Sequence, residues 1–117
     1  MISGTVSTDG VPVVVLEIAG RHWSAIIDTG FNGDLELPLE LKTLLPCRYI
    51  GQVTSLLAGG QRIEEDTFHV DIQFDGEFVR AEATFVPGGQ VLVGTRLLQT
   101  HRLEVDFPGR GVLLQRA

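Results

Sequence analysis

The chain has 117 residues, of which 44% are hydrophobic and 21% are charged, a composition typical of one folded domain and not of a disordered segment. Its 15 acidic residues outnumber its 9 basic residues, and the net charge of −6 argues against a general affinity for nucleic-acid phosphates or anionic membranes. We therefore expect a single domain over residues 1–117, with neither nucleic acid nor membrane as a partner.

Cys47 is the one cysteine, so the chain cannot form an internal disulfide, which fits a reducing compartment. No Cys-x-x-Cys or His-x-x-x-His spacing suggests a metal site, and we expect no cofactor. The longest apolar run, Val11 to Ile18, is interrupted by Pro12 and Glu17, and no basic stretch precedes it. We expect a cytoplasmic protein. Cys47 is less favoured as a nucleophile than as an inert thiol, because no His lies near it in the sequence.

The N-terminal half contains three strand-like segments, 11–19, 22–27 and 34–37. Residues 28–33, which separate the second segment from the third, are predicted to form a loop. Pro38 suits the first turn of a short helix that runs to Leu45, because its missing N–H is not needed there.

Residues 49–74 are predicted to form a long hairpin around Ala58-Gly59-Gly60-Gln61, because adjacent glycines allow the positive φ that a tight turn requires. In its second arm apolar and polar residues alternate from Phe68 to Phe74, the period of a strand with one buried face. His69 then points away from the core, and we expect His22 and His101 to be solvent-facing in the same way.

The C-terminal third continues the pattern of short strands and glycine-bearing turns. Strands are expected at 78–86, at 91–93, around Leu103, Val105 and Phe107, and at 112–114, and one short helix is expected at Arg96–Thr100. The fold class is therefore all-β.

Ala25-Ile26-Ile27-Asp28-Thr29-Gly30 places an acid immediately after an apolar strand. Two carboxylates at such a position can share one proton and hold a water, which the ionised member deprotonates while the protonated member donates to a carbonyl. Gly30 lets the backbone approach closely, and Thr29 can tie the loop down. The triplet alone is a weak signal, because turns use the same residues and chance gives it in roughly one or two chains in a hundred.

Three features in this order resemble the retropepsin-like aspartic proteases, the single-domain retroviral proteases and their bacterial relatives. They are the apolar-apolar-Asp-Thr-Gly of Ile26 to Gly30, the glycine-tipped hairpin around Gly59 and Gly60, and Leu92-Val93-Gly94 followed by Leu97-Leu98. The resemblance covers the chain from about Val11 to Phe107.

The resemblance implies an acid-protease barrel with a flap hairpin and one short C-terminal helix. Asp28, Thr29 and Gly30 are then the catalytic loop of an aspartic endopeptidase, and Ala58, Gly59 and Gly60 are the substrate-binding tip of the flap. With one such triplet per chain, the second carboxylate must come from another copy in a homodimer. A peptide or protein substrate would bind in extended form, as an added strand.

Three features depart from the viral pattern. Phe31 follows the triplet where viral members have a small residue. Thr95 occupies the position where viral members have an arginine. We interpret Arg96 as the replacement for that arginine, paired with Asp34. The chain also continues past Phe107 into a further hairpin, so the dimer interface is expected to differ. Two alternatives remain open: an inactive retropepsin-fold module for peptide binding or dimerisation, and an unrelated small β-barrel module in which Asp28 is a turn residue.

Overall fold

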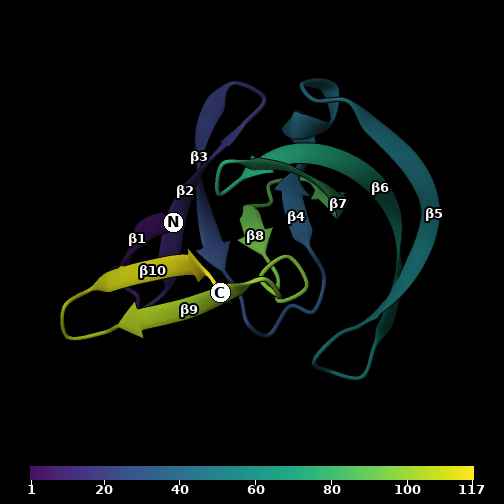
Figure 1. The fold of residues 1–117 in the computed structure, drawn as a ribbon. Helices are drawn as coiled ribbons and strands as arrows, with labels where there is room; N and C mark the ends of the chain where they lie inside the picture. The colour runs from purple at the N-terminus through teal and green to yellow at the C-terminus, as the bar shows by residue number, and fades with distance from the viewer.

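The computed structural model describes residues 1–117 and consists of ten β-strands and one 3₁₀ helix (Figure 1). The strands are β1 (Ile2–Val6), β2 (Pro12–Ile18), β3 (Arg21–Ile27), β4 (Leu35–Pro38), β5 (Cys47–Leu56), β6 (Arg62–Phe74), β7 (Glu77–Val86), β8 (Val91–Val93), β9 (His101–Asp106) and β10 (Gly111–Arg116), and the 3₁₀ helix is η1 (Leu39–Thr43). The all-β prediction is confirmed. No helix has the length and apolar character needed to cross a membrane.

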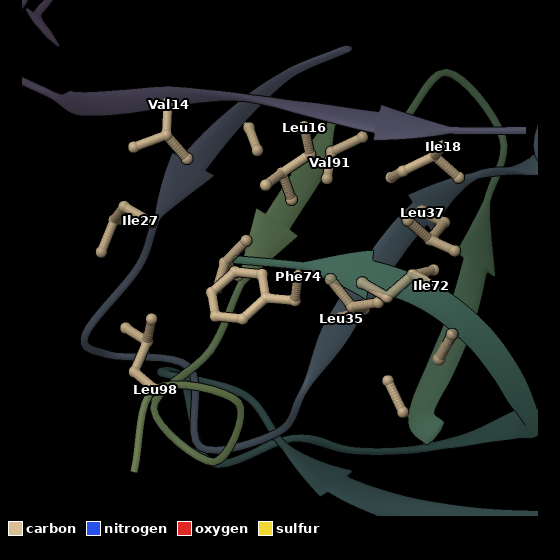
Figure 2. Packing of buried hydrophobic residues seen from close by; sticks show 14 of the residues in the cluster. Val14, Leu16, Ile18, Ile27, Leu35, Leu37, Ile72, Phe74, Val91 and Leu98 are labelled. Atoms are coloured by element: carbon tan, nitrogen blue, oxygen red, sulfur yellow. The ribbon is translucent and has the colours of Figure 1, made fainter. Parts of the chain in front are cut away.

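All ten strands belong to one sheet in the order β5-β6-β7-β4-β8-β3-β2-β1-β10-β9. Most neighbours are antiparallel, but β8 runs parallel to β3, and β7 runs parallel to β4. Side chains of β2 and β6 meet in the core, where Val14, Leu16 and Ile18 face Ile72 and Phe74 (Figure 2). The strongly curved sheet thus wraps around a single core.

Side chains alternate between buried and exposed along the strands that form this core. In β2 the residues Val14, Leu16 and Ile18 are buried while Val15 and Glu17 are exposed. Phe68, Val70, Ile72 and Phe74 are buried in β6, as the alternation predicts. Fully burying an aliphatic or aromatic side chain of this kind contributes about 1.5–3 kcal/mol to the free energy of unfolding.

The long hairpin of β5 and β6 curves away from the body of the molecule (Figure 1). At its tip the Gly60 N–H donates to the Leu57 carbonyl at 2.9 Å, and the Leu57 N–H donates to the Gln61 carbonyl at 2.8 Å. Gly60 has a φ of 80°, whereas Gly59 does not have positive φ. The hairpin prediction is correct, but only one of the two glycines has the conformation that was expected of both.

Three sequence-based predictions differ from the structure. Residues 95–100, expected to contain a short helix over Arg96–Thr100, form successive turns instead. The first residues of that segment donate their N–H groups to the Asp28 loop, and so short a segment has little helix stability of its own. The helix predicted over 38–45 is limited to η1, and β1 was not predicted at all.

His101 is a further correction, because its side chain is 1% exposed and does not face solvent. Its Nε2 lies 2.9 Å from Oδ2 of Asp75, and its ring packs edge-on against Phe74. Hydrogen bonds from the Met1 ammonium and from His101 lower the pKa of the Asp75 carboxyl. His22 is exposed, as predicted, and His69 is half-buried.

Candidate active site

Asp28 lies directly after β3, where the chain leaves the sheet beside the parallel strand β8. Its N–H donates to the Val93 carbonyl at 2.9 Å, and its carbonyl accepts from the Phe31 N–H at 3.1 Å. Its carboxylate Oδ1 accepts from the Gly30 N–H at 3.0 Å. Asp28 is half-buried and Thr29 is exposed, so the carboxylate is held in place while remaining accessible.

A second segment, Val93 to Arg96, holds the Asp28 loop in position through backbone hydrogen bonds. The N–H groups of Gly94, Thr95 and Arg96 donate to the carbonyls of Asp34, Phe31 and Gly33 at 2.9, 2.8 and 3.2 Å. A Cβ on Gly94 would lie 2.0 Å from the Gly33 carbonyl oxygen. Only glycine allows this approach, which gives a physical reason for the apolar-apolar-Gly pattern.

Arg96 pairs with two acids at this junction. Its Nε lies 3.9 Å from Oδ1 of Asp34, the pairing inferred from the sequence, and its Nη1 lies 2.7 Å from Oε2 of Glu82, a partner the sequence analysis missed. Asp34 is buried, and its Oδ2 accepts from the Glu82 N–H at 2.9 Å. These contacts make Asp34 a structural acid that joins the loop to β7.

A cleft of about 490 Å³ lies between the Asp28 loop, the first arm of the hairpin and β7. Its lining includes Gly30 and Phe31 from the loop, and Val53 to Leu56 from the hairpin. Asp28 and Thr29 adjoin this lining through Gly30 and are not part of it. The cleft is not lined by the predicted substrate-binding residues Ala58, Gly59 and Gly60 either. In this conformation the hairpin contributes its first arm to the cleft and not its tip.

Two further acids, Glu36 and Glu65, lie close enough for the charge of Glu65 to act on Glu36. Glu36 on β4 is half-buried, and burial, together with the charges of Glu65 and Asp28, raises its pKa. Glu65 on β6 lines the cleft. In the sequence, Glu36 is the single acid between Leu35 and Leu37 and has the pattern of an ordinary strand residue. No group of three or more His, Cys, Asp or Glu residues is arranged to hold a metal ion.

No protein-family model and no curated protein sequence matches the chain. Among solved structures, it is similar to a retropepsin-like aspartic protease from Rickettsia conorii, with a TM-score of 0.69 and 16% sequence identity over 97% of this chain and 89% of that one. It is also similar to the protease of simian foamy virus, with a TM-score of 0.57 and 20% identity over 74% of this chain and 91% of that one.

The chain has a retropepsin-like fold. At these identities the likeness establishes the fold and leaves the chemistry to be argued from the residues themselves. Within the retropepsin-like fold, Asp28, Thr29 and Gly30 follow β3, and the Gly94 loop supports them. One chain supplies one Asp28 carboxylate to this site.

Proposed function

We propose that this protein is an aspartic endopeptidase that acts as a homodimer, with one Asp28 from each chain. The observation that carries the proposal is the placement of Asp28. An accessible carboxylate, held by the Gly30 N–H, stands at the strand end of a retropepsin-like fold beside a cleft large enough for peptide side chains.

The reaction needs two carboxylates that share one proton. The ionised Asp28 takes a proton from a water molecule as its oxygen attacks the peptide carbonyl carbon, and the protonated Asp28 of the partner subunit donates its proton to the carbonyl oxygen. As the tetrahedral intermediate collapses, the Asp28 that took the water's proton gives it to the amine nitrogen, the C–N bond breaks, and the now ionised Asp28 of the partner subunit takes a proton back from a hydroxyl of the intermediate. The products are a carboxylic acid and an amine, and no cofactor takes part.

The hairpin arm supports an extended substrate. Val53 and Leu56 are exposed apolar residues on β5, and both line the cleft. A peptide lying between this arm and the Asp28 loop can add to the sheet as a strand and place alternate side chains in the cleft. Phe31, which also lines the cleft, reduces the space next to the catalytic loop.

The test is digestion of an unbiased peptide library with wild type and Asp28→Asn, read by mass spectrometry. Asn preserves the shape but removes the base and the shared proton, so we expect cleavage to fall by at least about 10³-fold with unchanged thermal unfolding. Asp71→Asn, at an exposed residue of β6, is the matched control and should cleave normally. Equal cleavage by Asp28→Asn would show that Asp28 is not the catalytic acid, whereas no cleavage by wild type at any pH would favour the inactive peptide-binding module instead.

A further inference from the structure

A second cleft, of about 670 Å³, opens beside β2 and β3. Its apolar lining includes Val13, Ile26 and Pro38, and the side chain of Trp23 also lines it. The Trp23 indole N–H donates to the Ile18 carbonyl at 3.2 Å, which holds the ring in place. The second cleft therefore offers apolar surface and an aromatic ring to a side chain that enters it.

This cleft extends along the face of β3 that also presents Asp28. Successive side chains of a strand point to opposite faces, so Ile26 and Asp28 share one face while Ala25 and Ile27 point into the core. Ile26 and Asp28 are two residues apart, about 7 Å along a strand, and the same spacing separates alternate side chains of an extended peptide. An extended substrate with its cleaved bond at Asp28 can therefore place a nearby side chain in the second cleft.

Both charged side chains that line the second cleft are acidic. They are Asp9, in the turn between β1 and β2, and Glu40, in η1. Neither carboxylate has an ion-pair partner in the chain, and no Lys, Arg or His lines the cleft. The two unpaired carboxylates attract a cationic group and repel an anionic one.

The first cleft differs in its charges. Its one cation, Arg96, pairs with Asp34 and Glu82, so only Glu65 among its charged residues has no ion-pair partner. Two unpaired acids and an aromatic ring occur together only in the second cleft. Selection of a cationic side chain is therefore assigned to the second cleft.

We propose that the second cleft takes an arginine side chain of the substrate close to the cleaved bond, with Asp9, Glu40 and Trp23 as the residues that select it. This inference rests on the proposed function and names its substrate class. The aliphatic stem of arginine can pack on Val13 and Ile26. Its planar guanidinium can stack on the indole and bind carboxylates through two parallel hydrogen bonds, which lysine cannot do. An acidic side chain would meet two like charges.

A binding experiment tests the cleft without any cleavage. Trp23 is the one tryptophan of the chain, so its fluorescence reports on this cleft alone. The probes are N-acetyl-arginine amide and its neutral isostere N-acetyl-citrulline amide, titrated at low salt. We expect a saturable response to the arginine probe and binding at least about tenfold weaker for the citrulline probe.

Charge-removing variants locate the binding. Asp9→Asn and Glu40→Gln should each weaken binding of the arginine probe several-fold. Both residues are exposed, so thermal unfolding should not change. Glu104→Gln, at an exposed position of β9, removes the same charge far from the cleft lining and should have no effect.

Cleavage of matched peptides gives a second measurement. For wild type, kcat/KM should be about tenfold higher for peptides with arginine near the cleaved bond than for the same peptides with citrulline. The double variant Asp9→Asn, Glu40→Gln should lose this preference while cleaving the citrulline peptides as wild type does.

The outcomes separate this inference from the proposed activity. If peptides are cleaved with no preference for arginine, if the double variant keeps the preference, or if Trp23 fluorescence does not distinguish the two probes, the assignment of the second cleft is wrong and the protease proposal stands. If the arginine probe binds selectively and the variants weaken it but no peptide is cleaved, the cleft stands as a site for a basic side chain and the protease proposal fails.

Discussion

At the scale of single residues, Gly94 is the glycine with the least space for an added Cβ. Gly94→Ala places a Cβ 2.0 Å from the Gly33 carbonyl oxygen, so the two loops must separate. We expect a loss of at least about 2 kcal/mol in the free energy of unfolding, together with reduced cleavage, because the displaced loop carries Asp28. Denaturant unfolding measures the loss. Gly111→Ala, where nothing lies within 4 Å of the added Cβ, is the control and should be near neutral.

Glu36 gives a prediction with a definite pH dependence. Burial and the charges of Glu65 and Asp28 raise its folded-state pKa above the unfolded value, so the folded chain binds the proton more tightly. Stability is therefore lost as pH rises from the unfolded pKa to the raised one, and the penalty persists at neutral pH.

Glu36→Gln removes this penalty. Thermal unfolding should show a higher Tm than wild type at pH 7 and a gain that disappears below about pH 4, where Glu is protonated in both states. A gain that is constant across pH would mean that the effect comes from packing and not from charge. Glu17→Gln, at an exposed site, should leave Tm unchanged at both pH values.

Among the structural elements, the β5–β6 hairpin offers a matched pair of substitutions at its tip. Neither Gly59 nor Gly60 has an atom within 4 Å of an added Cβ, but only Gly60 has positive φ. Gly60→Val should therefore distort the turn at a cost of about 1–3 kcal/mol, whereas Gly59→Val should be tolerated.

Because the tip is exposed and remote from the core, a strained turn can open locally without unfolding the rest of the chain, so Gly60→Val should lower kcat/KM several-fold while Tm falls little. Peptide cleavage and thermal unfolding of both variants measure this difference. Unchanged turnover in Gly60→Val would show that the hairpin does not close over substrate.

For the whole molecule, the proposed function depends on a second copy. If the site needs one Asp28 from each chain, a monomer is inert, and specific activity should fall on dilution below the dissociation constant of the dimer. Mixing wild type with a tenfold excess of Asp28→Asn should also suppress cleavage, because heterodimers hold one carboxylate and one amide. Activity assays over a dilution series, matched by sedimentation, measure both effects.

A monomer with full activity would contradict the shared site. A second acid would then have to come from the same chain, and Asp34 is the next acid along the sequence after Asp28. The structure commits its carboxylate to the Glu82 N–H and places it next to Arg96, so Asp34 is poorly suited to that role.

The sequence by itself determined the features that depend on local periodicity and backbone chemistry. Alternation of apolar and polar residues predicted β6, because strand period follows directly from residue order, and short Val- and Ile-rich runs between glycine-bearing turns predicted β2 and the all-β class. Asp28 at the end of an apolar strand and the glycine-tipped hairpin were likewise readable, since they need only neighbouring residues. Even the Arg96–Asp34 pairing could be inferred from the order of motifs.

Only the tertiary structure decided what depends on distant partners. The strand β1 has few apolar residues and lies between β2 and β10, of which β10 is more than a hundred residues away in the sequence. Residues 95–100 begin with Thr95 and Arg96, whose N–H groups bond to the Asp28 loop, and form turns instead of a helix. His101 is buried because the β6–β7 turn brings Asp75 to it. The free edge of β9 follows from the order of strands in the sheet, which hydrogen bonds between distant segments establish and local sequence does not encode.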